Sequence, residues 1–175
     1  MAFPWNAGDT LNAADLNDYA GLVYMKTVTV GSAVTSVGVT GLTGFDAYQF
    51  VFDKIDPTTG VLIVVDDFVT LTSALWRTTT TLFNQSGTPA VYTKFNAADG
   101  FVGLMDTSTS ACTMTVHQLN DAGSNTRFYA MSQYSDGFSI GGGRYAANAA
   151  ATTLTFKCSS GTMTGGNIHI YGLNT

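Results

Sequence analysis

The sequence is poor in charge and has no glutamate. Charged residues make up 11% of the 175 residues, against roughly 25% in ordinary soluble domains. All 12 acidic residues are aspartates, and with seven Lys and Arg residues they give a net charge of −5. The basic residues are scattered along the sequence, which argues against a basic groove for nucleic acid. Thr, Gly, Ser and Asn replace the charges, so the surface is expected to be neutral and rich in hydroxyl groups.

Several sequence features that define common protein classes are also missing. The two cysteines, Cys112 and Cys158, form no CxxC motif and lie near no histidine cluster, which excludes a zinc site of the usual spacing. They are expected to be reduced and buried, with a disulfide as the alternative. No apolar run approaches the roughly 20 residues needed to span a bilayer, and the N-terminus lacks the basic and apolar regions of an export signal. We therefore expect no membrane partner and no cofactor or metal.

Hydrophobic residues nevertheless make up 45% of the chain, enough for a folded core. The length suits one domain with a short appendage. The sequence pattern changes near Lys26, and we expect an N-terminal arm over residues 1–25 and a single domain over residues 26–175.

The arm contains the one convincing helix signal. Asn12 is suited to cap a helix and Asp15 to favour its positive end, while Leu11 and Leu16 have the spacing of a hydrophobic staple. Leu16, Tyr19, Ala20 and Val23 continue as an apolar stripe at helical spacing, so this short helix must dock on another surface. The segment Phe3-Pro4-Trp5 places two aromatics around a proline, which suggests a peg seated in a partner, with packing on the same chain as the alternative.

From Lys26 onward the pattern is that of β-structure. Short runs of β-branched and aromatic residues alternate with Gly, Asn, Asp and Ser turns, as in the run of Tyr48, Phe50 and Phe52, which share one face of a strand covered on that side. Further strands are expected at 27–30, 61–65, 71–77, 91–95, 101–105, 112–119, 127–134, 138–145, 154–158 and 167–171. The helical segments that βαβ units need between strands are missing. The fold class is therefore all-β, an antiparallel jelly-roll-like β-sandwich preceded by the arm with its short α-helix.

The candidate catalytic and metal-binding groups are sparse. Gly141-Gly142-Gly143 has no Gly-Lys-Ser/Thr after it and is better explained as a bend or bulge than as a phosphate loop. Asp66 and Asp67 are neighbours on a strand and point to opposite faces, whereas Asp53, Asp56 and Asp66 leave a calcium site as an alternative.

The two histidines and four aromatic residues complete the candidates for chemistry. His117 and His169 lie inside strands, on the face opposite their apolar neighbours, and the chain has no Gly-x-Ser-x-Gly nucleophile motif. We therefore expect no enzyme. The aromatics Tyr129, Tyr134, Phe138 and Tyr145 suit core packing, with sugar stacking as the alternative for any that are exposed.

Two stretches resemble proteins of tailed-bacteriophage particles. The segment Gly8-Asp9-Thr10-Leu11-Asn12-Ala13-Ala14-Asp15-Leu16-Asn17, after Trp5, resembles the opening segment of many phage fibre, tailspike and minor structural proteins, where it is a virion-attachment arm. The C-terminal run Leu154-Thr155-Phe156, followed by residues 159–173 with Ile170-Tyr171-Gly172-Leu173, is similar to the last two strands of phage jelly-roll domains. Residues 45–57 are similar to an early strand of those domains.

This resemblance implies a non-enzymatic virion protein that commonly assembles as a homotrimer. Its anchoring contacts to capsid or tail proteins would come from the arm, through Phe3, Trp5, Leu11, Leu16, Tyr19 and Val23. The first expectation is a capsid decoration or cement protein. The alternatives are a tail-fibre or tail-associated receptor-binding module, with loops at 78–87 and 121–126 contacting host glycan or protein, and an enzyme acting on surface polysaccharide. The expected location is the virion, after assembly in the host cytoplasm.

Overall fold

The computed structural model describes residues 21–57, 61–66, 76–84, 87, 89–97, 100–105, 111–135, 137–148, 150–158 and 160–174. These residues form antiparallel β-strands joined by turns, and none of them lies in a helix. The described part of the chain accordingly offers no helix with the length and apolarity that a membrane crossing needs. The expectation of an all-β fold is confirmed.

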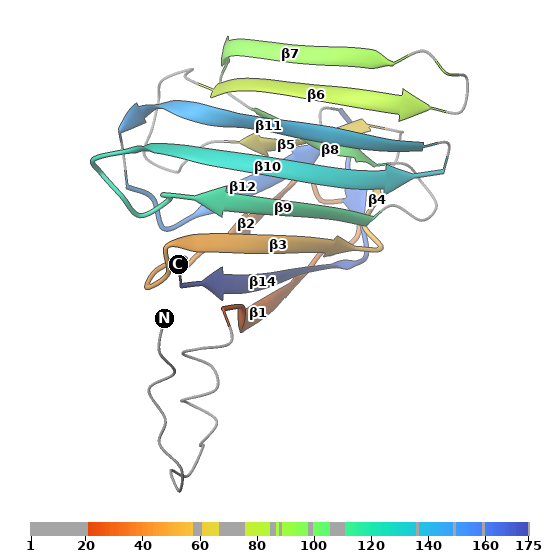
Figure 1. The fold of residues 1–175 in the computed structure, drawn as a ribbon. Helices are drawn as coiled ribbons and strands as arrows, with labels where there is room; N and C mark the ends of the chain where they lie inside the picture. The colour runs from red at the N-terminus through yellow and green to blue at the C-terminus, as the bar shows by residue number, and fades with distance from the viewer. Residues whose placement is uncertain are drawn as a thin grey trace, which may run out of the picture.

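Two large sheets make up the fold, and Figure 1 shows the larger one in front of the smaller one. The eight-stranded sheet has the order β1 (Val23–Thr29), β14 (Asn167–Leu173), β3 (Ala47–Asp53), β9 (Ala111–His117), β10 (Asn125–Tyr134), β11 (Gly137–Asn148), β6 (Trp76–Asn84) and β7 (Ala90–Ala97). The four-stranded sheet has the order β2 (Ser36–Val39), β12 (Leu154–Cys158), β5 (Val61–Asp66) and β8 (Gly100–Met105). A two-stranded ribbon of β13 (Met163–Thr164) and β4 (Asp56–Pro57) completes the fold.

The core lies between the two sheets, because one face of each sheet is apolar. In β10 every second residue from Thr126 to Tyr134 is buried, and the residues between them are exposed. The ring of Phe156 in β12 packs edge-on against Phe50 and Phe52 in β3, at centroid distances of 5.3 and 4.9 Å. Edge-to-face packing at this distance is favourable beyond area burial. This arrangement is consistent with a β-sandwich, and β3 is covered on the side that its sequence pattern predicts.

The first and last strands of the described domain lie side by side. Strand β1 forms an edge of the large sheet and pairs with β14, so that Val23 lies opposite Gly172. The prediction that Val23 ends a helical stripe is wrong, because Val23 begins a strand. The physical reason is that the edge of β14 can pair with the β-branched run that begins at Val23. This strand pairing outweighs the weak preference for a helix that the spacing of Leu16, Tyr19, Ala20 and Val23 indicates. The rest of the predicted helix, residues 12–20, lies outside the described residues.

Two further predictions are corrected by β6 and β11. Residues 78–84 form most of β6 and are not a loop, because a run of β-branched threonines suits a pleated strand. The triple glycine lies inside β11 with regular pairing on both sides, and is neither a bend nor a bulge. Gly143 is needed there because a Cβ atom at this position would lie 2.5 Å from the Arg77 carbonyl oxygen and 2.5 Å from Thr78 Cγ2 of β6.

The histidines lie as alternation predicts, and the cysteines are free and buried as expected. His117 and His169 are half-buried, on the face opposite the buried Val116, Ile168 and Ile170. Cys112 and Cys158 are free, buried thiols. Burial raises the pKa of Cys112 to about 12 and that of Cys158 to about 11, so both thiols stay protonated and unreactive at neutral pH.

Candidate functional site

The outer face of the eight-stranded sheet, which points away from the smaller sheet, carries an exposed apolar patch. The patch consists of Phe83, Val91, Met131, Phe138 and Ile140, from β6, β7, β10 and β11. Met131 and Ile140 lie opposite each other and are 59% and 50% exposed. The rings of Phe83 and Phe138 stack at 4.8 Å. Contiguous exposed side chains of this kind mark interaction surfaces, whereas scattered single ones do not.

A groove runs beside this patch. It has a volume of about 580 Å³, and Met131, Gln133 and Phe138 line it together with Ala111 and Thr113 of β9. Patch and groove together give a partner both an apolar surface and a concave feature to fill.

The same outer face carries a row of arginines nearer the other end of the strands. Arg127 of β10 pairs in register with Arg144 of β11, and Arg144 pairs with Arg77 of β6. His117 of β9 lies opposite Arg127 on the other side. We call Arg77, Arg144 and Arg127 the arginine row. Neighbouring strands are about 4.8 Å apart, so the three residues lie close together, and they are three of the seven basic residues of the chain.

An aromatic surface adjoins the arginine row. Tyr129 is two residues from Arg127 on the same face of β10 and is 59% exposed. Its ring stacks on His117 at a centroid distance of 5.9 Å and an interplanar angle of 29°. Of the four aromatics considered from sequence, Tyr134 and Tyr145 are buried as predicted, whereas Tyr129 and Phe138 are exposed.

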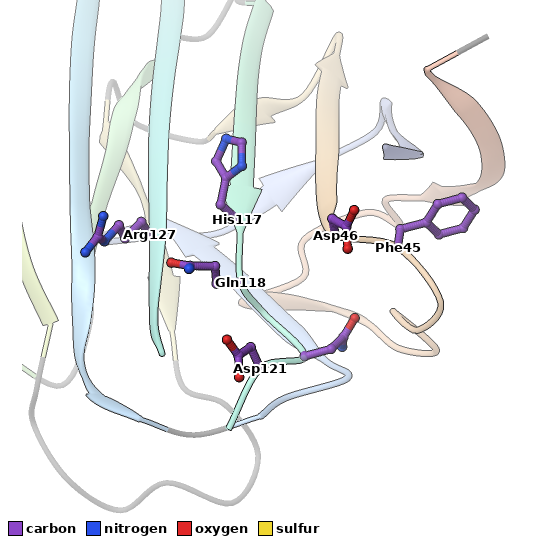
Figure 2. A pocket seen from close by; sticks show the side chains of 7 residues that line it. Phe45, Asp46, His117, Gln118, Asp121 and Arg127 are labelled. Carbon is purple, nitrogen blue, oxygen red and sulfur yellow. The ribbon is translucent and has the colours of Figure 1, made fainter. Parts of the chain in front are cut away.

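A cleft of about 740 Å³ lies beside the end of the row. Its lining comprises Phe45, Asp46, His117, Gln118, Asn120, Asp121 and Arg127. Figure 2 shows His117 at the end of β9, with Arg127 on one side of it and Asp46, before β3, on the other. The cleft therefore presents the guanidinium of Arg127, the carboxylates of Asp46 and Asp121 and the carboxamide of Gln118 to a ligand.

The turn between β9 and β10 forms one wall of the cleft, and Asn120 holds it in place. The Asn120 side chain accepts a hydrogen bond from the Tyr48 hydroxyl at 2.5 Å. Its amide donates to the carbonyl oxygens of Leu42 at 2.7 Å and Ala151 at 2.6 Å. One side chain thus ties the turn to three separate segments.

The Asp121 carboxylate is fixed by its own turn. The Ser124 side chain donates a hydrogen bond to it, and the Gly123 amide donates another at 2.7 Å. Both hydrogen bonds lower the pKa of Asp121. Asp121 is therefore ionised at neutral pH, and the cleft has a fixed negative charge on the wall that this turn forms. In the described residues no group of three or more His, Cys, Asp or Glu side chains could hold a metal ion.

The predicted anchoring residues and this outer face are separate parts of the chain. Phe3, Trp5, Leu11, Leu16 and Tyr19 lie outside the described residues, and Val23 lies in edge strand β1. Sequence reasoning missed the arginine row, because its members are 50 and 17 residues apart along the chain (Arg77 to Arg127 to Arg144). Neither a protein-family model nor a curated protein matches the chain.

Proposed function

We propose that this chain is a non-enzymatic structural protein of a tailed-bacteriophage virion. It is a jelly-roll-like knob that assembles as a homotrimer, is anchored to the particle through residues 1–25, and serves as a capsid decoration or cement protein. The resemblance of residues 8–17 and 154–173 to phage proteins supports the virion setting. The observation that carries the assembly role is the exposed apolar patch on the outer face of the eight-stranded sheet.

The physical argument for assembly rests on the cost of leaving the patch in water. Burying apolar surface contributes about 25 cal/mol per Å², and closed symmetric assemblies are the usual way in which identical chains cover such surfaces. The side chains around Met131 and Ile140 are uncharged, including Thr81 and Thr113 in the same register row. Their burial against a second copy therefore desolvates no charge at the centre of the patch.

The assembly is tested by mass measurement. We expect light scattering and native mass spectrometry to give three times the 18.4 kDa chain mass for the wild-type protein. The double variant Met131→Lys, Ile140→Lys is expected to be monomeric with an unchanged circular dichroism spectrum, because both positions are exposed. Tyr24→Lys, at an exposed position in edge strand β1, is the matched control and should remain trimeric. A wild-type protein that is monomeric at high micromolar concentration would refute the assembly role.

A second candidate function is a tail-associated receptor-binding module. The arginine row, with its cleft and the stacked Tyr129 and His117, favours it, because a coat protein needs no such polar site. Immunogold labelling of particles with antibody against the chain separates the two. Label over the head supports decoration, label confined to the tail supports receptor binding, and particles without label contradict both.

A further inference from the structure

We propose that the arginine row and the adjoining cleft bind an acidic saccharide, one whose sugar rings carry carboxylate or phosphate groups. This inference goes beyond the assembly role and names a ligand class for the second candidate function. It starts from a feature that folding alone does not favour, namely like charges placed side by side in a sheet.

The row contains two cross-strand pairs of like charge. Arg144 lies directly opposite Arg77 on one side and Arg127 on the other, and like charges directly opposite each other destabilise a sheet. The Arg127 guanidinium has no hydrogen bond or ion pair with the described residues, and the Arg144 guanidinium donates to a neutral group, the Asn125 side-chain oxygen, at 3.3 Å. At least two guanidinium groups on an exposed surface are therefore left without a carboxylate partner.

The geometry of the row suits a ligand with repeated negative charges. A guanidinium presents planar, paired donors that match carboxylate and phosphate oxygens. Three of them on consecutive strands, about 4.8 Å apart at the backbone, can contact successive acidic groups of a chain molecule lying across the strands. A single small anion would contact only one or two of these guanidinium groups.

The neighbouring groups favour a saccharide over other polyanions. The exposed ring of Tyr129, held by its stacking on His117, offers a flat apolar surface for the C–H face of a sugar ring. Beyond it, Asp46, Asp121 and Gln118 line the cleft with acceptors and a carboxamide that suit sugar hydroxyls. A nucleic acid carries a phosphate at every nucleotide and would set one against these two carboxylates. A saccharide can present hydroxyl groups to the carboxylates and its acidic groups to the arginines.

The saccharide site and the apolar patch are compatible on one molecule. Arg127 and Met131 are four residues apart on β10, which corresponds to about 13 Å along a strand, and Tyr129 lies between them, about 7 Å from each. An assembly through the patch therefore leaves room for a ligand at the arginine row.

The test is a titration of the full-length protein by calorimetry. The probes are trigalacturonate, which carries a carboxylate on each ring, glucose 6-phosphate, and the neutral trisaccharide of galactose. We expect at least one acidic probe to bind ten times more tightly than the neutral one, and the tighter of the two identifies carboxylate or phosphate as the preferred group. Arg127→Gln should weaken that binding at least tenfold.

Control variants separate the site from general charge effects. Lys54→Gln removes the same charge at an exposed position outside the row and cleft, and this variant should bind the probes as the wild-type protein does. Tyr129→Ala should weaken saccharide binding but not the binding of hexa-aspartate. Three results would each overturn the proposal. The acidic and neutral probes could bind equally, Arg127→Gln and Lys54→Gln could lose the same affinity for the acidic probe, or hexa-aspartate could bind as tightly as trigalacturonate. The mass of Arg127→Gln is measured in parallel, and an assembled variant without saccharide affinity distinguishes failure of this site from failure of the assembly role.

Discussion

Replacement of Asn120 by alanine should destabilise the protein far more than its half-buried position suggests. The substitution removes three hydrogen bonds at once, from the Tyr48 hydroxyl and to the carbonyl oxygens of Leu42 and Ala151. Tyr48 is fully buried, and burial is the main cause that raises its hydroxyl pKa, so its hydroxyl would be a neutral donor left without a partner.

The magnitude follows from these three partners. A buried polar group that loses its hydrogen bond costs about 1–3 kcal/mol, and water can enter at the half-buried turn to satisfy part of the loss. We therefore expect the free energy of unfolding to fall by about 2–4 kcal/mol. For a chain of this size the midpoint of thermal unfolding moves by about 2–4 °C per kcal/mol, so a decrease of about 4–16 °C is expected.

Urea and thermal unfolding followed by circular dichroism measure this effect. Asn125→Ala is the matched control, because its side chain bonds Asn148 and Arg144 at the surface, and a change within about 0.5 kcal/mol is expected. A double-mutant cycle with Tyr48→Phe should show coupling of about 1 kcal/mol, because the phenylalanine leaves no orphaned hydroxyl. If Asn120→Ala were as stable as Asn125→Ala, the view that Asn120 holds the wall of the cleft would be refuted.

Two further substitutions test the packing of the sandwich. The Thr80 hydroxyl is buried and has no hydrogen-bond partner among the described residues, so Thr80→Val should raise the free energy of unfolding by about 1 kcal/mol. A lower urea midpoint would contradict this. Gly143→Ala should lower the free energy of unfolding by about 1–3 kcal/mol, because the new methyl group would lie 2.5 Å from the Arg77 carbonyl oxygen of β6. Gly142→Ala should lower the free energy of unfolding by less, because the nearest atom to its new methyl group would be the Phe128 carbonyl oxygen at 3.1 Å. If urea unfolding showed Gly142→Ala to be the less stable of the two variants, backbone crowding would not be the reason for the glycine run.

Local patterns were enough to predict much of the fold. Residues 154–158 form a strand with the predicted limits, because its alternation of apolar and polar residues leaves one choice of buried face. The threonine run at 78–84 was mistaken for a loop because threonine is polar, although its branched Cβ favours a strand. The end of the predicted helix at Val23 failed because the pairing of β1 with β14 depends on residues almost 150 positions away.

One part of the candidate site also follows from local sequence patterns. Alternation alone places Arg127 and Tyr129 on one face of a strand, and the short connection between Tyr134 and Gly137 fixes the pairing of Arg127 with Arg144, since a tight hairpin sets its own register. Those facts could be read from the amino-acid sequence.

The rest of the site was decided by the tertiary structure. The positions of Arg77 and His117 beside this pair, and the cleft between Asp46 and Arg127, depend on which strands become neighbours in the eight-stranded sheet. The sequence determined which residues face outward, because that depends on local periodicity. The sheet order decided which of them become neighbours, because segments far apart in the sequence compete to form the same backbone hydrogen bonds.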